Sequence, residues 1–201
     1  MKLKSIILGS IFIMTSCNLT AQDIQLPEPT RKGGMPLMEA INNRHSSREF
    51  SDATLTNQQL SDMLWATCGY NRPDKRTVAT ALNRQEMSAY IVTPEAIYKY
   101  EPKENKLIHI TSGDHRDVFA AQDFAKNAPL NVALVADLAK QDKKEFAGMT
   151  VGAMSNNIYL WCASEGLNTV TRASFNQEGM KKAMKLSETE EVLLVQTVGK
   201  K

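Results

Sequence analysis

Cysteine and histidine are scarce in this chain, and neither shows the spacing of metal ligands. The sequence holds three cysteines, at positions 17, 68 and 162, and three histidines, at positions 45, 109 and 115. No Cys or His pair at short spacing occurs, so the sequence predicts no metal site. Cys68 and Cys162 each lie in an apolar helical pattern, which is typical of buried thiols, although an oxidising compartment would also permit a bridge.

An excess of charge of one sign is also absent. The formal net charge of the 201 residues is +2 and the basic residues are dispersed, which excludes a nucleic-acid partner. The chain has no internal repeat and no glycine-rich strand–turn–helix loop, so side chains would have to hold any phosphate of a ligand. With 42% hydrophobic residues, the length suits one globular domain with a core.

Residues 1–21 have the layout of a secretory signal peptide. Lys2 and Lys4 precede an apolar run at 6–14, which is too short to span a bilayer comfortably. The stretch "MTSC" resembles a bacterial lipoprotein box that would leave an acylated Cys17, whereas "LTA" would be cut before Gln22. We expect an exported protein, periplasmic or anchored to the membrane by a lipid on Cys17, and we favour the anchor over plain secretion. A buried N-terminal helix is the alternative.

Residues 22–35 and residues 36–201 differ in pattern. The first stretch holds two prolines, paired glycines and no periodicity, and predicts an extended arm. The second is periodic throughout and predicts one domain of mixed α and β structure around a sheet. Helices are predicted at about 36–43, 57–68, 115–125, 143–165 and 177–186, and strands at about 88–94, 96–101, 106–110, 131–138, 168–173 and 190–199.

Two local signals support these elements. Thr56 and Gln59 form a capping box before the second helix, and Gly69 is a natural stop after it. In the long helix, Gly148, Gly152 and Ser155 recur at spacings of four and three, and glycine inside a helix costs about 1 kcal/mol relative to alanine. This cost indicates that another backbone or a flat ligand approaches there, or that the helix packs closely within one subunit.

The stretch "NNRHSSREF" at 42–50 concentrates arginines and hydroxyl groups. Arginine donates forked, charge-assisted hydrogen bonds, and beside hydroxyl groups it suits a phosphate better than a carboxylate. On these residues alone, Arg44 and Arg48 could equally lie near a helix C-terminus, where the helix dipole favours cations.

Further segments place this stretch in context. "NRHSSREF" resembles the R-x-S-x-R-x-F signature of the FMN-dependent nitroreductase family, and "LTNQQLSDMLWATCGYN" resembles the helix that follows it. "RTVATALNRQEMSAYIV", "GMTVGAMSNNIYLWCASEGLNTV" and "VLLVQTVGK" are similar to three later segments, in the family's order. The resemblance covers about residues 30–200 and is strongest to a branch near the azoline dehydrogenases. It implies an α+β fold with a central, mostly antiparallel sheet flanked by helices, and a long helix at a homodimer interface.

The resemblance also implies roles for residues of the arginine stretch. Arg44 and Ser46 match residues that hold the phosphate of non-covalently bound FMN, and His45 matches one that lines the cofactor through its backbone. Arg48 matches the basic residue that faces the ribityl chain and the pyrimidine edge of the flavin. A fixed positive charge there would stabilise the reduced flavin, so Arg48 is a candidate catalytic residue.

Other positions carry over in the same way. Thr80, Ala81 and Asn83 match residues that reach the cofactor, commonly from the partner subunit. The family offers a backbone N–H to flavin N5 after the strand that follows the long helix, where this chain has Arg172, Ala173 and Ser174; Ala173 is therefore the second candidate catalytic residue. Lys200 matches a second phosphate-binding cation.

Some positions depart from the family pattern. Ala79 and Thr80 replace the usual Pro-Ser, Ser155 or Asn156 replaces the usual Gln, and no Lys/Tyr pair linked to azoline oxidation is present. We expect an exported FMN-dependent oxidoreductase that passes two electrons to a small molecule by a ping-pong mechanism, with NADH or NADPH as the candidate donor. The competing hypothesis is a surface lipoprotein that binds flavin or another ligand without turnover.

Overall fold

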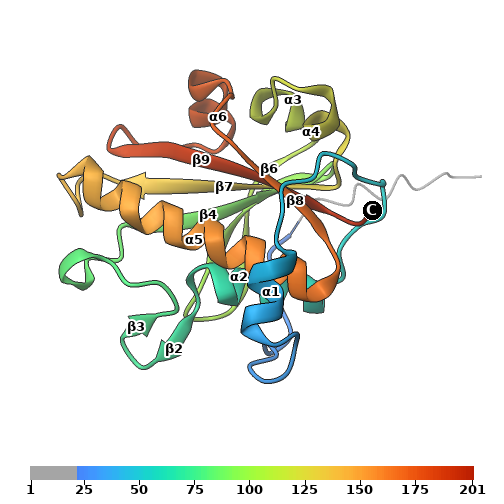
Figure 1. Ribbon diagram of the computed structural model, residues 1–201. Coiled ribbons are helices and arrows are strands. Elements are labelled where there is room, and N and C mark those ends of the chain that lie inside the picture. Colours follow the sequence, from blue (N-terminus) through green and yellow to red (C-terminus); the bar gives the residue numbers. More distant parts are fainter. Residues whose placement is uncertain (1–21) are drawn as a thin grey trace, which may run out of the picture.

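A seven-stranded sheet forms the centre of the protein (Figure 1). The computed structural model describes residues 22–201, so the predicted signal peptide and Cys17 lie outside the described residues. The strand order is β1-β6-β5-β4-β7-β9-β8, and every neighbouring pair is antiparallel. The strands of this sheet are β1 Ile24–Gln25, β4 Met87–Val92, β5 Ala96–Glu101, β6 Lys106–Ser112, β7 Leu130–Asp137, β8 Asn168–Arg172 and β9 Glu190–Gly199.

Helices cover both faces of the sheet, and a small separate hairpin joins β2 to β3. α1, α2 and α5 lie on one face, and α3, α4 and α6 lie on the other (Figure 1). The predicted α+β fold with a large antiparallel sheet is confirmed. The remaining elements are α1 Leu37–Asn43, α2 Asn57–Cys68, β2 Tyr70–Arg72, β3 Lys75–Arg76, the 3₁₀ turn η1 Ala81–Asn83, α3 Arg116–Phe119, α4 Asp123–Asn127, α5 Lys144–Glu165 and α6 Gln177–Ala183.

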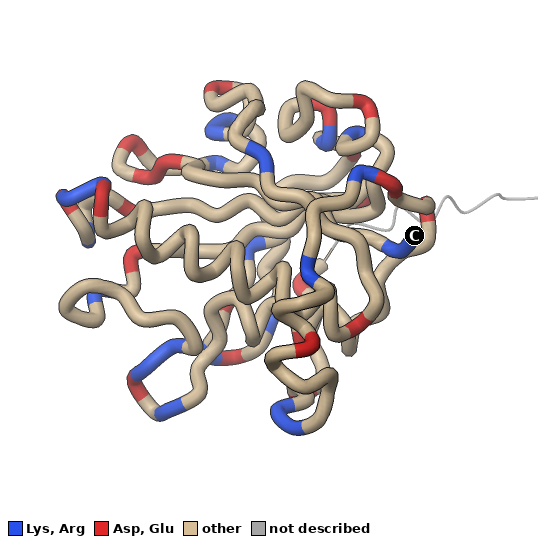
Figure 2. The backbone as a smooth tube through the Cα atoms, in the orientation of Figure 1, with Lys and Arg blue, Asp and Glu red and all other residues tan. Residues whose placement is uncertain are grey.

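The alternation of side chains along the central strands explains the two helical layers. Val132 and Leu134 of β7 pack under α2 and α5, whereas Ala133 and Val135 pack under α3 and α6. Because successive side chains of a strand point to opposite faces, an almost continuous apolar run is buried on both sides. Most charged residues therefore lie around the periphery, with basic and acidic positions interspersed, whereas Glu86 and Arg172 are buried (Figure 2).

The ends of α2 follow the local signals in the sequence. The hydroxyl of Thr56 accepts the backbone N–H of Gln59 at 3.2 Å, and the Gln59 side chain accepts the N–H of Thr56 at 3.0 Å. Gly69 ends the helix, and its N–H bonds the carbonyl of Trp65 at 2.8 Å. The predicted capping box and stop are confirmed.

The small residues of α5 do not share one surface. An added Cβ at Gly148 or Gly152 would meet no atom of this chain within 4 Å, so neither glycine serves close packing inside the subunit. Ser155 instead faces the sheet, where its hydroxyl donates to Gln196 Oε1 at 2.8 Å. The spacing of four and three predicts one ridge of small residues, which is wrong for Ser155, and the two glycines face the outside of the subunit.

The segment expected to form one helix over 115–125 forms two, α3 and α4. The carbonyl of Val118 accepts the N–H of Asn176 at 3.2 Å, and the carbonyl of Phe119 accepts Nη1 of Arg172 at 2.7 Å. A continuous helix would need both carbonyls for its own N–H groups. Because these carbonyls bond to distant residues instead, the helix breaks after Phe119, and the backbone of Ala120 is extended.

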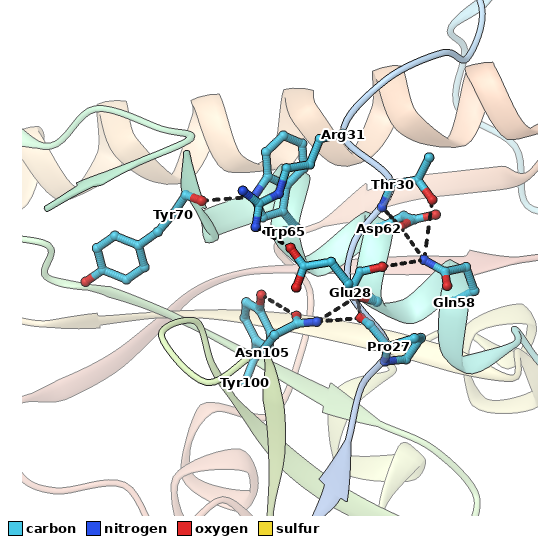
Figure 3. A network of polar contacts seen from close by, with 11 residues as sticks. Pro27, Glu28, Thr30, Arg31, Gln58, Asp62, Trp65, Tyr70, Tyr100 and Asn105 are labelled. Atoms are coloured by element: carbon cyan, nitrogen blue, oxygen red, sulfur yellow. Dashed lines mark hydrogen bonds and ion pairs between the residues drawn. The ribbon is translucent and has the colours of Figure 1, made fainter. Parts of the chain in front are cut away.

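The arm of residues 22–35 is tied to the domain along its length (Figure 3). β1 pairs with β6, and the carbonyl of Pro27 accepts Ser61 Oγ at 2.6 Å and Asn105 Nδ2 at 2.7 Å. Farther along, Asp62 accepts the N–H of Thr30 at 2.6 Å. Because its backbone groups find partners, the arm is held in place without regular structure of its own.

Two further expectations concern the cysteines and membrane contact. Cys68 and Cys162 are separate buried thiols, and burial raises the pKa of Cys68 to about 11 and that of Cys162 as well. Both thiols are therefore protonated and unreactive at neutral pH. Within residues 22–201, no helix combines the length and the apolar composition needed to cross a membrane.

Candidate functional site

The arginine loop, defined as residues 44–50, lies along the free edge of β8. β8 ends the strand order, so one side of its backbone has no neighbouring strand. The loop covers this side: Ser47 N–H donates to the Thr169 carbonyl at 2.9 Å, and Asn168 Nδ2 donates to the Glu49 carbonyl at 2.7 Å. Residue numbers rise along the loop, from Ser47 to Glu49, while those of their partners in β8 fall from Thr169 to Asn168, so the loop runs antiparallel to β8.

Tyr159 of α5 joins Arg44 to Ser46. Its hydroxyl lies 2.8 Å from Ser46 Oγ and accepts the backbone N–H of Thr171 at 3.0 Å. The guanidinium carbon of Arg44 lies 4.6 Å from the centroid of the Tyr159 ring, which is a cation–π contact. The structure thus brings Arg44 and Ser46 together, as the sequence predicts, and adds a residue that sequence reasoning missed.

The surroundings of Tyr159 perturb its phenol. Burial acts to raise the pKa of Tyr159, but the hydrogen bonds with Ser46 and Thr171 and the charge of Arg44 outweigh it, and the pKa is lowered. Tyr159 can be recognised as part of the site only once the structure shows that β8 lies beside this turn of α5. Tyr159 stands four positions after Ser155, and both side chains reach Thr171.

Three cations of the region have no acidic partner. Among residues 22–201, no carboxylate lies within ion-pair distance of Arg44, Arg48 or Lys200. The backbone carbonyl of Lys200 accepts the N–H of Ser51 at 2.9 Å, which places the end of β9 beside the end of the arginine loop. Unneutralised arginines and a lysine beside hydroxyl groups suit an anion.

Arg48 lies at the other end of the loop from Arg44. Its guanidinium carbon is 6.0 Å from the centroid of the Phe124 ring, and Phe124 stacks on Phe50 at 6.1 Å. The antiparallel run sets Arg48 opposite the start of β8, whereas Ala173 follows the end of that strand. At about 3.3 Å per residue, their backbones are about 15 Å apart, so the structure does not bring Arg48 beside Ala173.

Arg172 is buried and holds the protein together. Its guanidinium donates to the Phe119 carbonyl at 2.7 Å, to Asn131 Oδ1 at 2.7 Å and to Thr197 Oγ1 at 3.0 Å. Burial lowers the pKa of Arg172 to about 10, so the group stays charged at neutral pH. With its donors used inside the protein, the Arg172 side chain is not available to a cofactor, and any direct contact of this position with one is limited to its backbone.

The positions that follow β8 and the end of α1 remain open. Ala173 and Ser174 are exposed, so their backbone N–H groups lie at the surface beyond the strand. His45 is also exposed, and its Nδ1 lies 2.8 Å from the carbonyl of Asn43. Groups of three or more His, Cys, Asp or Glu residues that could hold a metal do not occur in the described part of the chain.

Thr80, Ala81 and Asn83 lie far from the arginine loop within one subunit. They precede β4, and the strand order places β7 and β9 between β4 and β8. The Thr80 hydroxyl accepts the N–H of Gln85 at 2.9 Å, and Asn83 Nδ2 donates to the Asp74 carbonyl at 3.2 Å. The Thr80 hydroxyl is thus engaged inside its own loop, and the Asn83 amide is engaged by the turn between β2 and β3.

Exposed apolar side chains gather on α1, α5 and the loop before β4. Leu82 is 85% exposed at a positive φ of 54°, and Met149 of α5 is 70% exposed. Leu37, Met38 and Ile41 of α1 are also exposed, and α1 packs against α5. Exposed large apolar side chains of this kind are typical of a protein–protein interface where they form one patch.

Comparison with known proteins identifies the family. The sequence pattern of the Nitroreductase family matches residues 41–200. The chain belongs to the nitroreductase family. A nitroreductase-like protein of Methanocaldococcus jannaschii is 28% identical over 198 residues, which cover 89% of this chain and 96% of the relative. The sequence-based recognition of the family is confirmed, and membership implies oxidoreductase activity.

Solved structures of nitroreductase-like proteins share the fold. One from Ralstonia eutropha superposes with a TM-score of 0.84 at 37% identity, covering 90% of each chain. Another, from Desulfovibrio desulfuricans and in complex with FMN, superposes with a TM-score of 0.62 at 16% identity, covering 83% of this chain and 87% of that one.

The hydrogen bonds of Arg172 predict the effect of a conservative substitution. Arg172→Lys keeps the charge, but a single ammonium group cannot reproduce the guanidinium fork to three acceptors. We expect the free energy of unfolding of the cofactor-free protein to fall by about 2 kcal/mol in urea titrations. Arg72→Lys, at an exposed position of β2, is the control and should change it by less than about 0.5 kcal/mol. An unchanged urea midpoint for Arg172→Lys would contradict the structural role of the Arg172 side chain and would allow it a role in the site.

Proposed function

We propose that the protein is an exported FMN-dependent oxidoreductase that transfers two electrons to a small-molecule acceptor. The observation that carries this proposal is the cluster of Arg44, Ser46 and Tyr159: an exposed fork of N–H donors and a hydroxyl, held side by side with no carboxylate to neutralise them. A phosphate monoester is the anion that such donors fit best.

The chain's own residues fit FMN at several points. Arg44 and Ser46 would hold the phosphate, with Lys200 as a further cation at the end of β9. The exposed backbone of Ala173 and Ser174 would offer an N–H to the flavin, and His45 would line it through its backbone. Arg48 would face the pyrimidine edge, which requires its guanidinium to leave the ring of Phe124.

FMN bound in this way would supply two-electron transfer at N5, where donor and acceptor react in turn, which gives ping-pong kinetics. The protein would hold the ring, expose one face and balance negative charge with Arg48. NADH or NADPH is the candidate donor. Azoline oxidation is not included in the proposal, although the motifs favour a branch near the azoline dehydrogenases, because the Lys/Tyr pair linked to that reaction is missing.

A homodimer with flavin sites between the subunits is part of the proposal. One subunit separates Thr80, Ala81 and Asn83 from the arginine loop, so only a second copy can supply these residues to the site. The 22 residues of α5 span about 33 Å between these two regions. A two-fold axis near the middle of α5 would set the loop before β4 of one copy against the arginine loop of the other. The open glycines and Met149 favour this face.

The proposed location follows from residues 1–21, which lie outside the described residues. Cleavage after Ser16 with acylation of Cys17 would anchor the protein in a membrane, and cleavage before Gln22 would release it. Near the start of the arm, the carboxylate of Asp23 pairs with Lys106 at 2.8 Å. In either case the mature chain keeps the contacts that tie the arm to the domain.

A binding protein without turnover is the second candidate. The hydroxyl of Thr80 and the amide of Asn83, which match cofactor contacts of the family, are hydrogen-bonded within the subunit, to Gln85 and to Asp74. Nicotinamide cofactors are also scarce outside the cytoplasm. These facts favour a protein that retains the fold and binds flavin or another ligand as a surface lipoprotein.

The Arg44→Ala variant tests FMN binding. Loss of a forked, charge-assisted contact should weaken FMN affinity about 10- to 100-fold, which corresponds to about 1.5–3 kcal/mol. Riboflavin lacks the phosphate and should bind weakly and almost equally to both proteins. Fluorescence titration measures both affinities, with Arg72→Ala on exposed β2 as the control. Equal losses for FMN and riboflavin would mean that Arg44 is structural.

Turnover distinguishes the oxidoreductase from the binding protein. Anaerobic mixing of the FMN-loaded protein with NADH or NADPH, then with a quinone or nitroaromatic acceptor, should bleach and restore the flavin absorbance. Arg48→Ala should keep FMN but have a reduction potential lower by tens of millivolts, since about 30 mV corresponds to about 1.4 kcal/mol for two electrons. An unchanged potential would remove Arg48 from its role, and a flavin that no donor reduces would favour the binding protein.

Gly152→Leu tests the dimer. An added Cβ would meet nothing within 4 Å in its own subunit, and leucine favours helix by about 0.8 kcal/mol over glycine, so the isolated subunit should be at least as stable. At a close contact between copies, the same side chain would overpack the interface. We expect sedimentation to show monomer, with FMN lost in parallel. Glu178→Leu on α6, across the sheet, should remain dimeric. A flavin-loaded wild-type monomer would contradict the shared site.

A further inference from the structure

Tyr159 is the point at which three elements of the phosphate site meet. It comes from α5, accepts a backbone N–H from Thr171 at the end of β8, and contacts Arg44 and Ser46 of the arginine loop. Thr171 is itself fixed from the same helix, because its hydroxyl lies 2.8 Å from Ser155 Oγ. Two side chains four residues apart on α5 therefore hold one residue of β8.

The direction of the hydrogen bonds at Tyr159 matters for an anion. Its oxygen already accepts the Thr171 N–H, at 3.0 Å. If the phenol then donates its own proton to Ser46 Oγ, the Ser46 hydroxyl keeps its single proton for a ligand. In the reverse arrangement, the Ser46 hydroxyl would donate its single proton to Tyr159 and would have none left for a ligand. A bound phosphate, which only accepts, selects the first arrangement.

The contact with Arg44 is compatible with the same ligand. The guanidinium carbon of Arg44 lies over the Tyr159 ring, 4.6 Å from its centroid. Arginine commonly stacks its flat face on aromatic rings, and in that arrangement the N–H donors on the edges of the guanidinium plane are directed outward. An exposed arginine would otherwise sample many rotamers, and a restricted one loses less entropy when it binds.

We propose that Tyr159 is a positioning residue that orders Arg44 and Ser46 for the phosphate group of FMN. The inference rests on the proposed function, and it assigns the phenol a role that neither the arginine loop nor α5 shows alone. The hydroxyl acts through Ser46, and the ring acts through Arg44. The two contributions can be removed separately, because Tyr159→Phe deletes only the hydroxyl whereas Tyr159→Leu deletes both.

The test compares FMN with riboflavin on the full mature chain. Loss of one hydrogen bond in Tyr159→Phe should weaken FMN binding roughly 3- to 10-fold, and Tyr159→Leu should weaken it by a further factor of about 2 to 5. Riboflavin affinity should change less than about twofold, since it lacks the phosphate. Tyr100→Phe is the matched control: it deletes a phenol that donates to Asn105 Oδ1 at 2.9 Å in the turn between β5 and β6, and it should leave both affinities unchanged.

A second pair of variants separates positioning from a structural role. In a Ser46→Ala background, Tyr159→Phe should cause no further loss of FMN affinity, because the hydroxyl has nothing left to orient. Equal losses for FMN and riboflavin, or full additivity with Ser46→Ala, would overturn the role of Tyr159 while leaving the proposed function intact. A wild-type protein that binds neither flavin would overturn the proposed function and with it the phosphate role of Tyr159.

Discussion

The free edge of β8 is the constraint on which the candidate site depends. An edge strand offers unpaired N–H and C=O groups, and proteins cover such edges or pair them. Here the cover consists of a loop backbone at Ser47 and a phenol at Tyr159. Since the same loop carries Arg44 and Ser46, satisfying the strand also fixes the donors. The contacts that cover the sheet edge are therefore the same ones that hold the donors of the proposed anion site.

The sheet supplies the site with a second fixed element, the buried charge of Arg172. Its guanidinium is surrounded by dipoles of Phe119, Asn131 and Thr197 and has no carboxylate beside it. A cation held in this way is costly for the fold but creates a positive field near the end of β8. Ala173 and Ser174 follow directly, so the exposed backbone of this end lies beside a permanent positive charge. An anionic ligand is favoured there even where Arg172 makes no contact with it.

Much of the fold was predictable from the sequence because local and tertiary preferences agree. Thr56 and Gln59 set the start of α2, and the apolar run of β7 is buried on both faces. Where tertiary hydrogen bonds compete with local ones, prediction failed: Phe119 and Val118 give their carbonyls to distant partners, and the expected helix breaks. Pattern alone cannot show such competition, because the partners lie more than fifty positions away.

The site was predictable to a smaller extent. Arg44 and Ser46 stand in one short stretch, so their proximity follows from the sequence. Arg172 was grouped with them by resemblance, yet it shares a strand face with Val170, and this alternation already indicated a buried side chain. Tyr159 gave no signal, since its role depends on how α5 lies against β8. The way α5 packs against β8 decides which of its hydroxyl groups reaches the arginine loop.

The loop before β4 has an unusual conformation that the proposed homodimer would explain. Leu82 has a positive φ of 54° and is 85% exposed, although a bulky residue in the left-handed region costs about 1–2 kcal/mol. Asn83 and Gln85 adopt positive φ as well. Hydrogen bonds from Gln85 to Asp74 and Asn83 hold this conformation, but they offer no reason to present leucine to water. Burial of Leu82 against a second copy would offset the strain. The same contact would carry Thr80 and Asn83 to the arginine loop, so strain, dimer face and cofactor site have one explanation.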